Sequence, residues 1–331
     1  MYSFNGKDWS LEQKITDNTY STFASGGIAL WNNYLIVGNK DEDNGATVDA
    51  GSVSIFKKSS NAAGGTTFGT WQKVAGGFPL SGANYKMGAY VAMYGDVAAV
   101  AGGGAGFLVL YRKGTTDSWT AEQTITLTLG AQKITSVALY GHFLAIGSYY
   151  GISHYVDIYR YDPVNSTWSS YQQIIGSNSS GFGSSVSLTD GLLAVAASST
   201  KEVKIYRNKG SSTKFAIEVT LTRPTGEDGD FGADVAINQG AVLVGVPGGT
   251  SSTTANNKGH AYLYTYVKGT GWKTVTDPDV SVVKEISFNP SYSGKNYFGA
   301  SVGLSESMAI IGVGNQSTTE FNKAYIYPVG P

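Results

Sequence analysis

The residues best suited to chemistry form an acidic run between residues 41 and 49. Three aspartates in that run, Asp41, Asp43 and Asp49, are spaced so that a curled loop would gather their carboxylates. Carboxylate oxygens are ligands that Ca²⁺ prefers. The run does not fit an EF-hand, because Gly45 stands at its fifth position and not its sixth. The run therefore indicates either a Ca²⁺ site or a solvated acidic loop. No other cofactor is expected.

A Gly-x-Ser-x-Gly sequence around Ser301 matches the motif that presents the nucleophile of serine hydrolases. That motif needs a helix after the serine, and none is expected here. A serine nucleophile also needs a positioned base, and His142, His154 and His260 are expected in separate turns and strand starts. No catalytic residue is assigned, and the chain is predicted not to be an enzyme. The alternative is a hydrolase or lyase with Asp234 in a central channel.

Composition excludes several classes of protein. The 331 residues include no Cys, which rules out disulfides and Cys-ligated metals. Lys and Arg number 23 against 24 Asp and Glu, and no basic cluster stands out, so no nucleic-acid partner is expected. The apolar stretch at 87–111 contains Asp96 and many glycines, and is therefore interpreted as two strands rather than as a membrane insertion.

Six copies of one pattern organise the chain. They begin at residues 24, 87, 133, 182, 231 and 298. Each copy begins with an alternating apolar stretch, a polar turn and a nearly continuous apolar run. A third segment then ends in an aromatic residue. In all copies but the last, a fourth segment follows, which usually begins with an aromatic residue. Four short strands in each repeat are typical of a β-propeller blade.

The predicted fold is all-β: a six-bladed β-propeller of four-stranded blades, in a single domain over 1–331. The last repeat lacks a fourth strand and residues 9–15 resemble one, so the segment 1–15 is expected to close the ring. Residues 2–4 resemble a third strand, which leaves a truncated seven-bladed ring as the alternative. The expected blades cover residues 16–74, 75–127, 128–174, 175–221, 222–286 and 287–331.

Phe-Gly at 182–183, 231–232 and 298–299, with Gly-Val-Pro at 245–247, gives the whole chain a resemblance to the FG-GAP repeat family of integrin α-like propellers. The resemblance implies a propeller fold and a role in adhesion. Calcium-binding members carry an Asp-x-Asp-x-Asp-Gly loop between the first and second strands, and the corresponding turns here lack it. The run at 41–49 instead resembles an Asp-rich loop that a microbial branch carries between the second and third strands.

Aromatic and amide residues outside the repeated positions are the candidates for ligand binding. Aromatics that recur in every repeat are expected to pack between blades. Those that break the pattern belong to long connections, where binding residues concentrate. The candidate ligand-binding residues are Tyr85, Tyr149, Tyr150, Asn256, Asn257, Tyr292 and Tyr297.

These features favour a binding module for adhesion, scaffolding or recognition, whose long-loop face binds a protein or glycan ligand. The alternatives are a structural subunit of a larger assembly and a carbohydrate-binding lectin. The resemblance implies an extracellular or cell-surface location, although the N-terminus shows no signal peptide. The sequence sets no oligomeric state.

Overall fold

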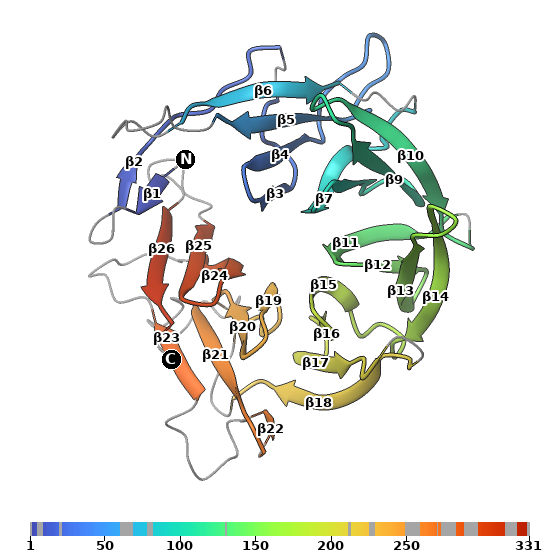
Figure 1. Ribbon diagram of the computed structural model, residues 1–331. Coiled ribbons are helices and arrows are strands. Elements are labelled where there is room, and N and C mark those ends of the chain that lie inside the picture. Colours follow the sequence, from blue (N-terminus) through green and yellow to red (C-terminus); the bar gives the residue numbers. More distant parts are fainter. Residues whose placement is uncertain are drawn as a thin grey trace. The chain divides into compact units, whose positions relative to one another are not determined.

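The computed structural model of this chain is built of β-strands, and its described part contains no helix, hence none that could cross a membrane (Figure 1). The chain forms two compact units, Met1–Val137 and Ala138–Pro331. The residues that the structure describes are 2–4, 9–19, 22–59, 69–77, 82–129, 131–210, 213–224, 229–248, 259–269, 271–272, 283–287, 297–314 and 323–329.

The first unit contains two four-stranded antiparallel sheets and a short hairpin. The hairpin pairs β1 (Tyr2–Phe4) with β2 (Trp9–Leu11). Blade 1 consists of β3 (Ile28–Trp31), β4 (Tyr34–Asn39), β5 (Ser52–Lys58) and β6 (Trp71–Gly76). Blade 2 consists of β7 (Met87–Tyr94), β8 (Val97–Gly102), β9 (Phe107–Lys113) and β10 (Trp119–Thr126).

The second unit contains the sheets of the later repeats, and β11 begins just before the boundary between the units. Blade 3 consists of β11 (Lys133–Tyr140), β12 (Phe143–Tyr150), β13 (Ser153–Asp162) and β14 (Thr167–Ile175). Blade 4 consists of β15 (Phe182–Thr189), β16 (Leu192–Ala197), β17 (Glu202–Arg207) and β18 (Ala216–Thr222).

The last two blades depart from the four-strand pattern. Blade 5 consists of β19 (Val235–Ile237), β20 (Ala241–Val246) and β21 (His260–Val267), and its fourth strand is divided into β22 (Gly271–Trp272) and β23 (Val283–Ser287), which both pair with β21. Blade 6 shows three strands in its described residues, β24 (Tyr297–Leu304), β25 (Met308–Gly314) and β26 (Lys323–Pro328). Every repeat found in the sequence forms a blade, and the predicted six-bladed β-propeller fold is confirmed.

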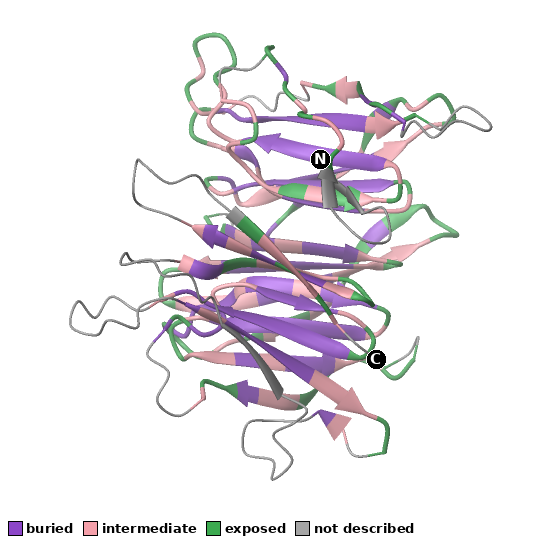
Figure 2. Cartoon of the chain, turned by 90° about the vertical axis from the view of Figure 1, so that its left-hand side faces the viewer, coloured by how far each residue is buried: buried purple, intermediate pink, exposed green. Residues whose placement is uncertain are grey.

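Continuous apolar runs become the second strands of the blades, which are covered on both faces. In both β4 and β16 all six residues are buried, and the buried residues concentrate in the middle strands of the sheets (Figure 2). The phenylalanines of the Phe-Gly pairs, Phe182, Phe231 and Phe298, are at most 2% exposed. Each belongs to a hydrophobic cluster shared by two neighbouring blades.

The glycine after that phenylalanine, or after its equivalent Met87, lets neighbouring blades approach closely. A Cβ on Gly38 of blade 1 would lie 1.9 Å from the carbonyl oxygen of Gly88 in blade 2, and Gly88 has a φ of +87°. The same contact joins blades 5 and 6, where a Cβ on Gly245 would lie 2.1 Å from the Gly299 oxygen. Only glycine fits at such backbone contacts.

A glutamine side chain joins the outer strands of successive blades. In the second unit, the side-chain amide of Gln172 in blade 3 donates to the Phe215 carbonyl at 2.9 Å and accepts from the Phe215 N–H at 2.8 Å. In the first unit, Gln13 makes the same pair of bonds to Trp71 of blade 1, at 3.0 and 2.7 Å. Ile15 packs in the same cluster as Trp71.

The two glutamines have the same place in their sequence segments. Gln13 follows Trp9 by the same interval that separates Gln172 from Trp168. The N-terminal segment therefore acts toward blade 1 as a fourth strand acts toward the next blade, which is the place expected of a closing strand. The regular strand is shorter than the predicted 9–15: it ends at Leu11 and pairs with β1. That the segment completes the last blade stays a prediction.

Gln13→Ala and Gln172→Ala should each lower the free energy of unfolding by about 1–3 kcal/mol, because the backbone groups of the next blade lose both partners. Chemical denaturation monitored by tryptophan fluorescence measures the change. Gln72→Ala, at an exposed position of β6, is the matched control and should have little effect. If Gln172→Ala lowers the free energy of unfolding and Gln13→Ala does not, the N-terminal segment does not act as an outer strand.

A second contact of the N-terminal segment is electrostatic. Asp17 is 8% exposed, and its Oδ2 lies 2.6 Å from the Lys73 ammonium and accepts from the Ser54 hydroxyl at 2.9 Å. Burial acts to raise the pKa of Asp17, but Lys73 and the hydrogen bonds from Thr19 and Ser54 outweigh it and lower the pKa to about 2. The charged carboxylate therefore stabilises the folded chain.

Because the pKa of Asp17 is lower in the folded chain than the ordinary value of 3.8, its contribution to stability is complete above about pH 5 and disappears as the pH falls toward 2. We expect Asp17→Asn to remove about 2 kcal/mol at neutral pH. Urea unfolding of both proteins measures the effect. The difference between their free energies of unfolding should shrink as the pH falls from about 5 toward 2. A difference independent of pH would show that Asp17 acts without its charge.

Candidate functional site

The acidic loop between β4 and β5 is organised around a lysine. The Lys86 ammonium lies 3.3 Å from Asp41 Oδ1 and 3.2 Å from Asp49 Oδ2. Asp43 Oδ1 accepts a hydrogen bond from the Asp49 N–H at 2.8 Å. A hydrogen bond from Lys40 and a second from Lys86 lower the pKa of Asp41. The three predicted metal ligands thus share one loop, and two of them contact a cation of the protein.

The backbone holds this loop against the connection that leads to blade 2. Lys86 N–H donates to the Asp49 carbonyl at 2.9 Å, and Asn84 N–H donates to the Val48 carbonyl at 2.9 Å. Asp49, Asn84 and Lys86 all have positive φ, at 51°, 61° and 53°. Among the described residues, no three His, Cys, Asp or Glu side chains form a group that could hold a metal ion. Sequence reasoning missed Lys86, because it is distant in the chain from the aspartates.

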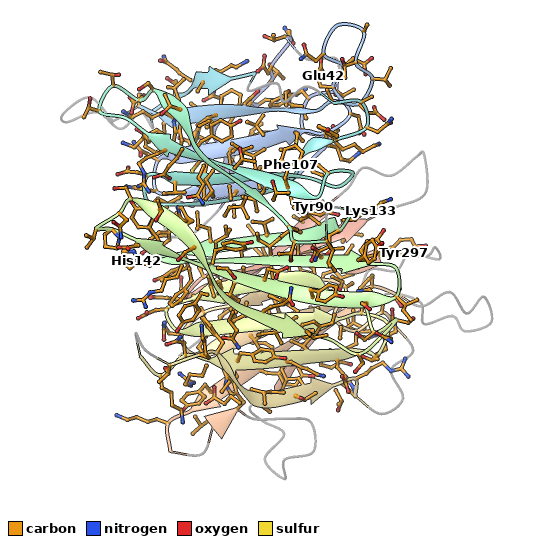
Figure 3. The ribbon with its side chains drawn as sticks, turned by 90° about the vertical axis from the view of Figure 1, so that its right-hand side faces the viewer. Glu42, Tyr90, Phe107, Lys133, His142 and Tyr297 are labelled. Carbon is orange, nitrogen blue, oxygen red and sulfur yellow. The ribbon has the colours of Figure 1, made fainter. Side chains whose placement is uncertain are left out.

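Tyr85, predicted to bind ligand, packs inside the first unit. Its ring meets Phe107 edge-on, with ring centroids 5.3 Å apart, and both rings pack against the hydrophobic cluster of blades 1 and 2. Figure 3 labels Phe107 within this unit and Glu42 on the acidic loop. Tyr85 supports the connection to blade 2 and presents little free surface.

An apolar patch lies at the turn between β12 and β13 in blade 3. Tyr150 is 49% exposed, Ile152 is 61% exposed, and Ile175 at the end of β14 is 68% exposed. The Ile152 carbonyl accepts from Ser179 N–H at 2.7 Å, and Tyr155 pairs with Ile175 in the sheet. These bonds hold the turn beside the end of β14. We call Tyr150, Ile152 and Ile175 the blade-3 patch.

Two neighbouring residues support the patch from within the sheet. The rings of Tyr149 and His154 lie opposite each other across β12 and β13, with centroids 5.9 Å apart. Burial lowers the pKa of His154 and so favours the neutral imidazole. The sequence had indicated Tyr149 and Tyr150 but not Ile152 or Ile175. An isoleucine in a tight turn, where polar residues are usual, could have been noticed.

The remaining predicted ligand residues are dispersed or not described. Tyr297 begins β24, where it pairs with Gly314 and is half-buried. It lies at the opposite end of the second unit from His142 (Figure 3). Asn256, Asn257 and Tyr292 lie outside the described residues.

The groups considered for catalysis have structural contacts. Asp234, on the chain leading into β19, accepts from the Ser185 hydroxyl at 2.7 Å and from the N–H groups of Val235 and Val302 at 2.9 and 2.8 Å. Burial raises the pKa of Asp234, and these hydrogen bonds oppose the rise. They join the first strands of blades 4, 5 and 6. Ser301 lies within β24, so the helix of a nucleophile motif does not follow it.

Comparison with known proteins shows the fold and no closer relationship. No family model matches the chain, and no curated protein matches it. Among solved structures, a protein from Lactobacillus plantarum is 13% identical with a TM-score of 0.57, over 91% of this chain and 79% of that one. Hsv2 from Kluyveromyces lactis is 11% identical with a TM-score of 0.51, over 88% and 70%. A candidate 6-phosphogluconolactonase from Bacteroides fragilis is 12% identical with a TM-score of 0.53, over 90% and 80%.

These matches correct one prediction and limit another. The prediction that the chain is not an enzyme is wrong, because one of the solved structures with a similar fold is described as an enzyme. The fold therefore does not exclude catalysis. At 12% identity that match assigns no reaction to this chain. None of these matches names the FG-GAP family, and what they support is the β-propeller.

The position of Lys86 makes the calcium hypothesis testable. Because its ammonium already contacts Asp41 and Asp49, we expect millimolar Ca²⁺ to leave the melting temperature of the wild type unchanged. Lys86→Ala frees the carboxylates for the metal and should gain a Ca²⁺-dependent rise of about 2–4 °C. Lys14→Ala, at an exposed position, is the control. A rise in the wild type would mean that Ca²⁺ displaces the lysine.

Proposed function

We propose that this chain is a recognition module that binds a protein partner through the blade-3 patch. The observation that supports the proposal is the joint exposure of Tyr150, Ile152 and Ile175, at 49%, 61% and 68%. Exposed apolar side chains gathered at one place mark interaction sites more often than scattered ones do. The turn that carries them is fixed by hydrogen bonds to its own sheet, so little order must be gained on binding.

The chemistry of the patch favours a protein over a glycan. Its exposed side chains are two isoleucines and one tyrosine, and none carries a charge. Full burial of an isoleucine side chain is worth about 1.5–3 kcal/mol. An apolar side chain of a partner would obtain that gain, whereas sugar hydroxyls would lose water without replacement. Tyrosine at the edge of such a patch is typical of protein interfaces.

A glycan remains the second candidate because polar groups lie beside Tyr150. Ser153 pairs with Tyr150 across the hairpin, and its hydroxyl lies 3.4 Å from Asn178 Oδ1. Aromatic faces next to hydroxyl and amide groups suit sugar rings. The resemblance to FG-GAP propellers supports a role in adhesion or scaffolding and an extracellular or cell-surface location, and we include both in the proposal.

The test is quantitative copurification from the native source, with the tagged chain as bait and mass spectrometry as the readout. Ile152→Ser with Ile175→Ser should reduce the recovery of a stoichiometric partner at least tenfold, since it removes the apolar gain of two exposed side chains. Val164→Ser is the matched control: Val164 is 89% exposed in blade 3, in the hairpin between β13 and β14, away from the patch.

The same variants distinguish the alternatives. Equal recovery with the double variant and with the control would contradict binding through the patch. Binding to a glycan array that Tyr150→Ala abolishes, while the double isoleucine variant preserves it, would favour the lectin instead. Circular dichroism should show that all the variants are folded.

A further inference from the structure

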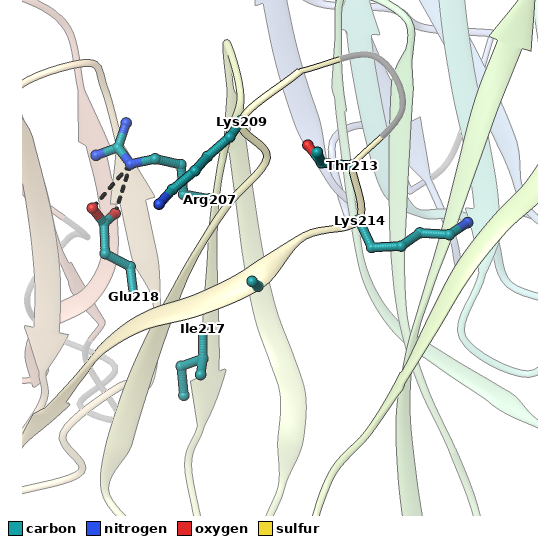
Figure 4. A pocket seen from close by; sticks show the side chains of 7 residues that line it. Arg207, Lys209, Thr213, Lys214, Ile217 and Glu218 are labelled. Carbon is teal, nitrogen blue, oxygen red and sulfur yellow. Dashed lines mark hydrogen bonds and ion pairs between the residues drawn. The ribbon is translucent and has the colours of Figure 1, made fainter.

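A second surface of the second unit is a cationic hollow on blade 4. It lies beside the hairpin that joins β17 to β18 and has a volume of about 230 Å³ (Figure 4). The side chains around it come from both strands and from the turn between them. They are Arg207, Lys209, Thr213, Lys214, Ala216, Ile217 and Glu218. Three are cations and one is an anion, so the lining carries a net charge of +2 (3 − 1).

The arginine of the hollow is fixed in place and keeps donors to spare. Arg207 Nε lies 2.9 Å from each carboxylate oxygen of Glu218 (Figure 4). Glu218 also accepts from the Trp272 indole N–H at 3.2 Å, and the Arg207 guanidinium lies 5.1 Å from the centroid of the Tyr266 ring. Because the ion pair uses Nε, the N–H groups on the two terminal nitrogens of Arg207 are left for an acceptor.

The lysines have different roles. Lys214 donates to the Tyr171 carbonyl and lies 3.8 Å from the centroid of its ring, which fixes the hairpin to blade 3. Lys209, by contrast, makes no hydrogen bond or ion pair with any described residue, and Figure 4 shows it extending beside Arg207 and Glu218. Glu218 is already paired with Arg207, so the charge of Lys209 leaves an excess of positive charge beside the pair.

Polar contacts hold the described residues on either side of this turn. Asn208 Nδ2 donates to the Thr213 carbonyl at 2.5 Å, and Asn208 Oδ1 accepts from Gly210 N–H at 2.9 Å. The Tyr171 hydroxyl also donates to the Thr213 carbonyl, at 2.5 Å. The hollow is therefore bounded by a hairpin held from both sides.

We propose that this hollow binds a tetrahedral oxyanion, phosphate or sulfate, free or as a group on a larger ligand. The terminal nitrogens of Arg207 and the ammonium of Lys209 would donate to its oxygens, and charge-assisted hydrogen bonds of this kind are the strong ones. An oxyanion relieves the repulsion between the two cations, which a neutral sugar or a metal ion would not do. The site is separate from the blade-3 patch and does not depend on it.

The test is calorimetric titration of the full chain with inorganic phosphate, inorganic sulfate and O-phosphoserine, at constant ionic strength set with NaCl. Phosphate should bind, and Lys209→Gln should weaken binding about tenfold, the loss of one charge-assisted hydrogen bond. Lys209→Glu should abolish it. Lys268→Gln, in the corresponding hairpin of blade 5, is the matched control and should bind as the wild type does.

Lys209 makes no hydrogen bond or ion pair with the described residues, so its variants should keep the wild-type melting temperature. Stronger binding of O-phosphoserine than of phosphate would indicate a carried phosphate group, and stronger binding of sulfate would indicate a sulfated ligand. No heat with any of the three anions would overturn the proposal. Equal weakening by the Lys209 and Lys268 substitutions would also overturn it, since it would show general attraction to positive charge.

Discussion

Backbone contact between neighbouring blades is the constraint on which the rest of each unit depends. At Gly38 against Gly88, and again at Gly245 against Gly299, two main chains approach so closely that a single added carbon would collide. The second strands that carry Gly38 and Gly245, β4 and β20, are buried along their whole length and are therefore mostly apolar. In these second strands little room is left for polar side chains, which lie in the other strands and in the connections.

Blades that pack without sharing a sheet still have backbone groups that need partners. Side chains supply them. Gln172 binds both backbone groups of Phe215, Gln13 does the same for Trp71, and Asp234 accepts from N–H groups of blades 5 and 6. Asp234, which the sequence offered as a candidate for catalysis, and the two glutamines are in this way used to join blades. These contacts explain why a polar residue at a repeated position of the blades is weak evidence for a catalytic role.

The two proposed binding surfaces use opposite kinds of strand connection. The blade-3 patch lies at the turn between the second and third strands of its blade, and the hollow lies at the hairpin between the third and fourth strands of blade 4. Antiparallel order places these connections at opposite ends of the strands. One surface is apolar and the other cationic, so each suits a different class of ligand, and hydrogen bonds hold described residues beside each of them.

The sequence by itself determined the architecture, because the blade pattern is local. Phe182, Phe231 and Phe298 with their glycines mark the blades, and the likeness of residues 9–15 to a fourth strand indicated an outer strand. The tertiary structure decided which side chains are free. Lys86 contacts Asp41 and Asp49 of the acidic loop, Tyr85 is packed against Phe107, and Ile152 and Ile175 are both exposed. Residues distant in sequence make these contacts, so exposure and charge pairing depend on blade packing that no local pattern encodes.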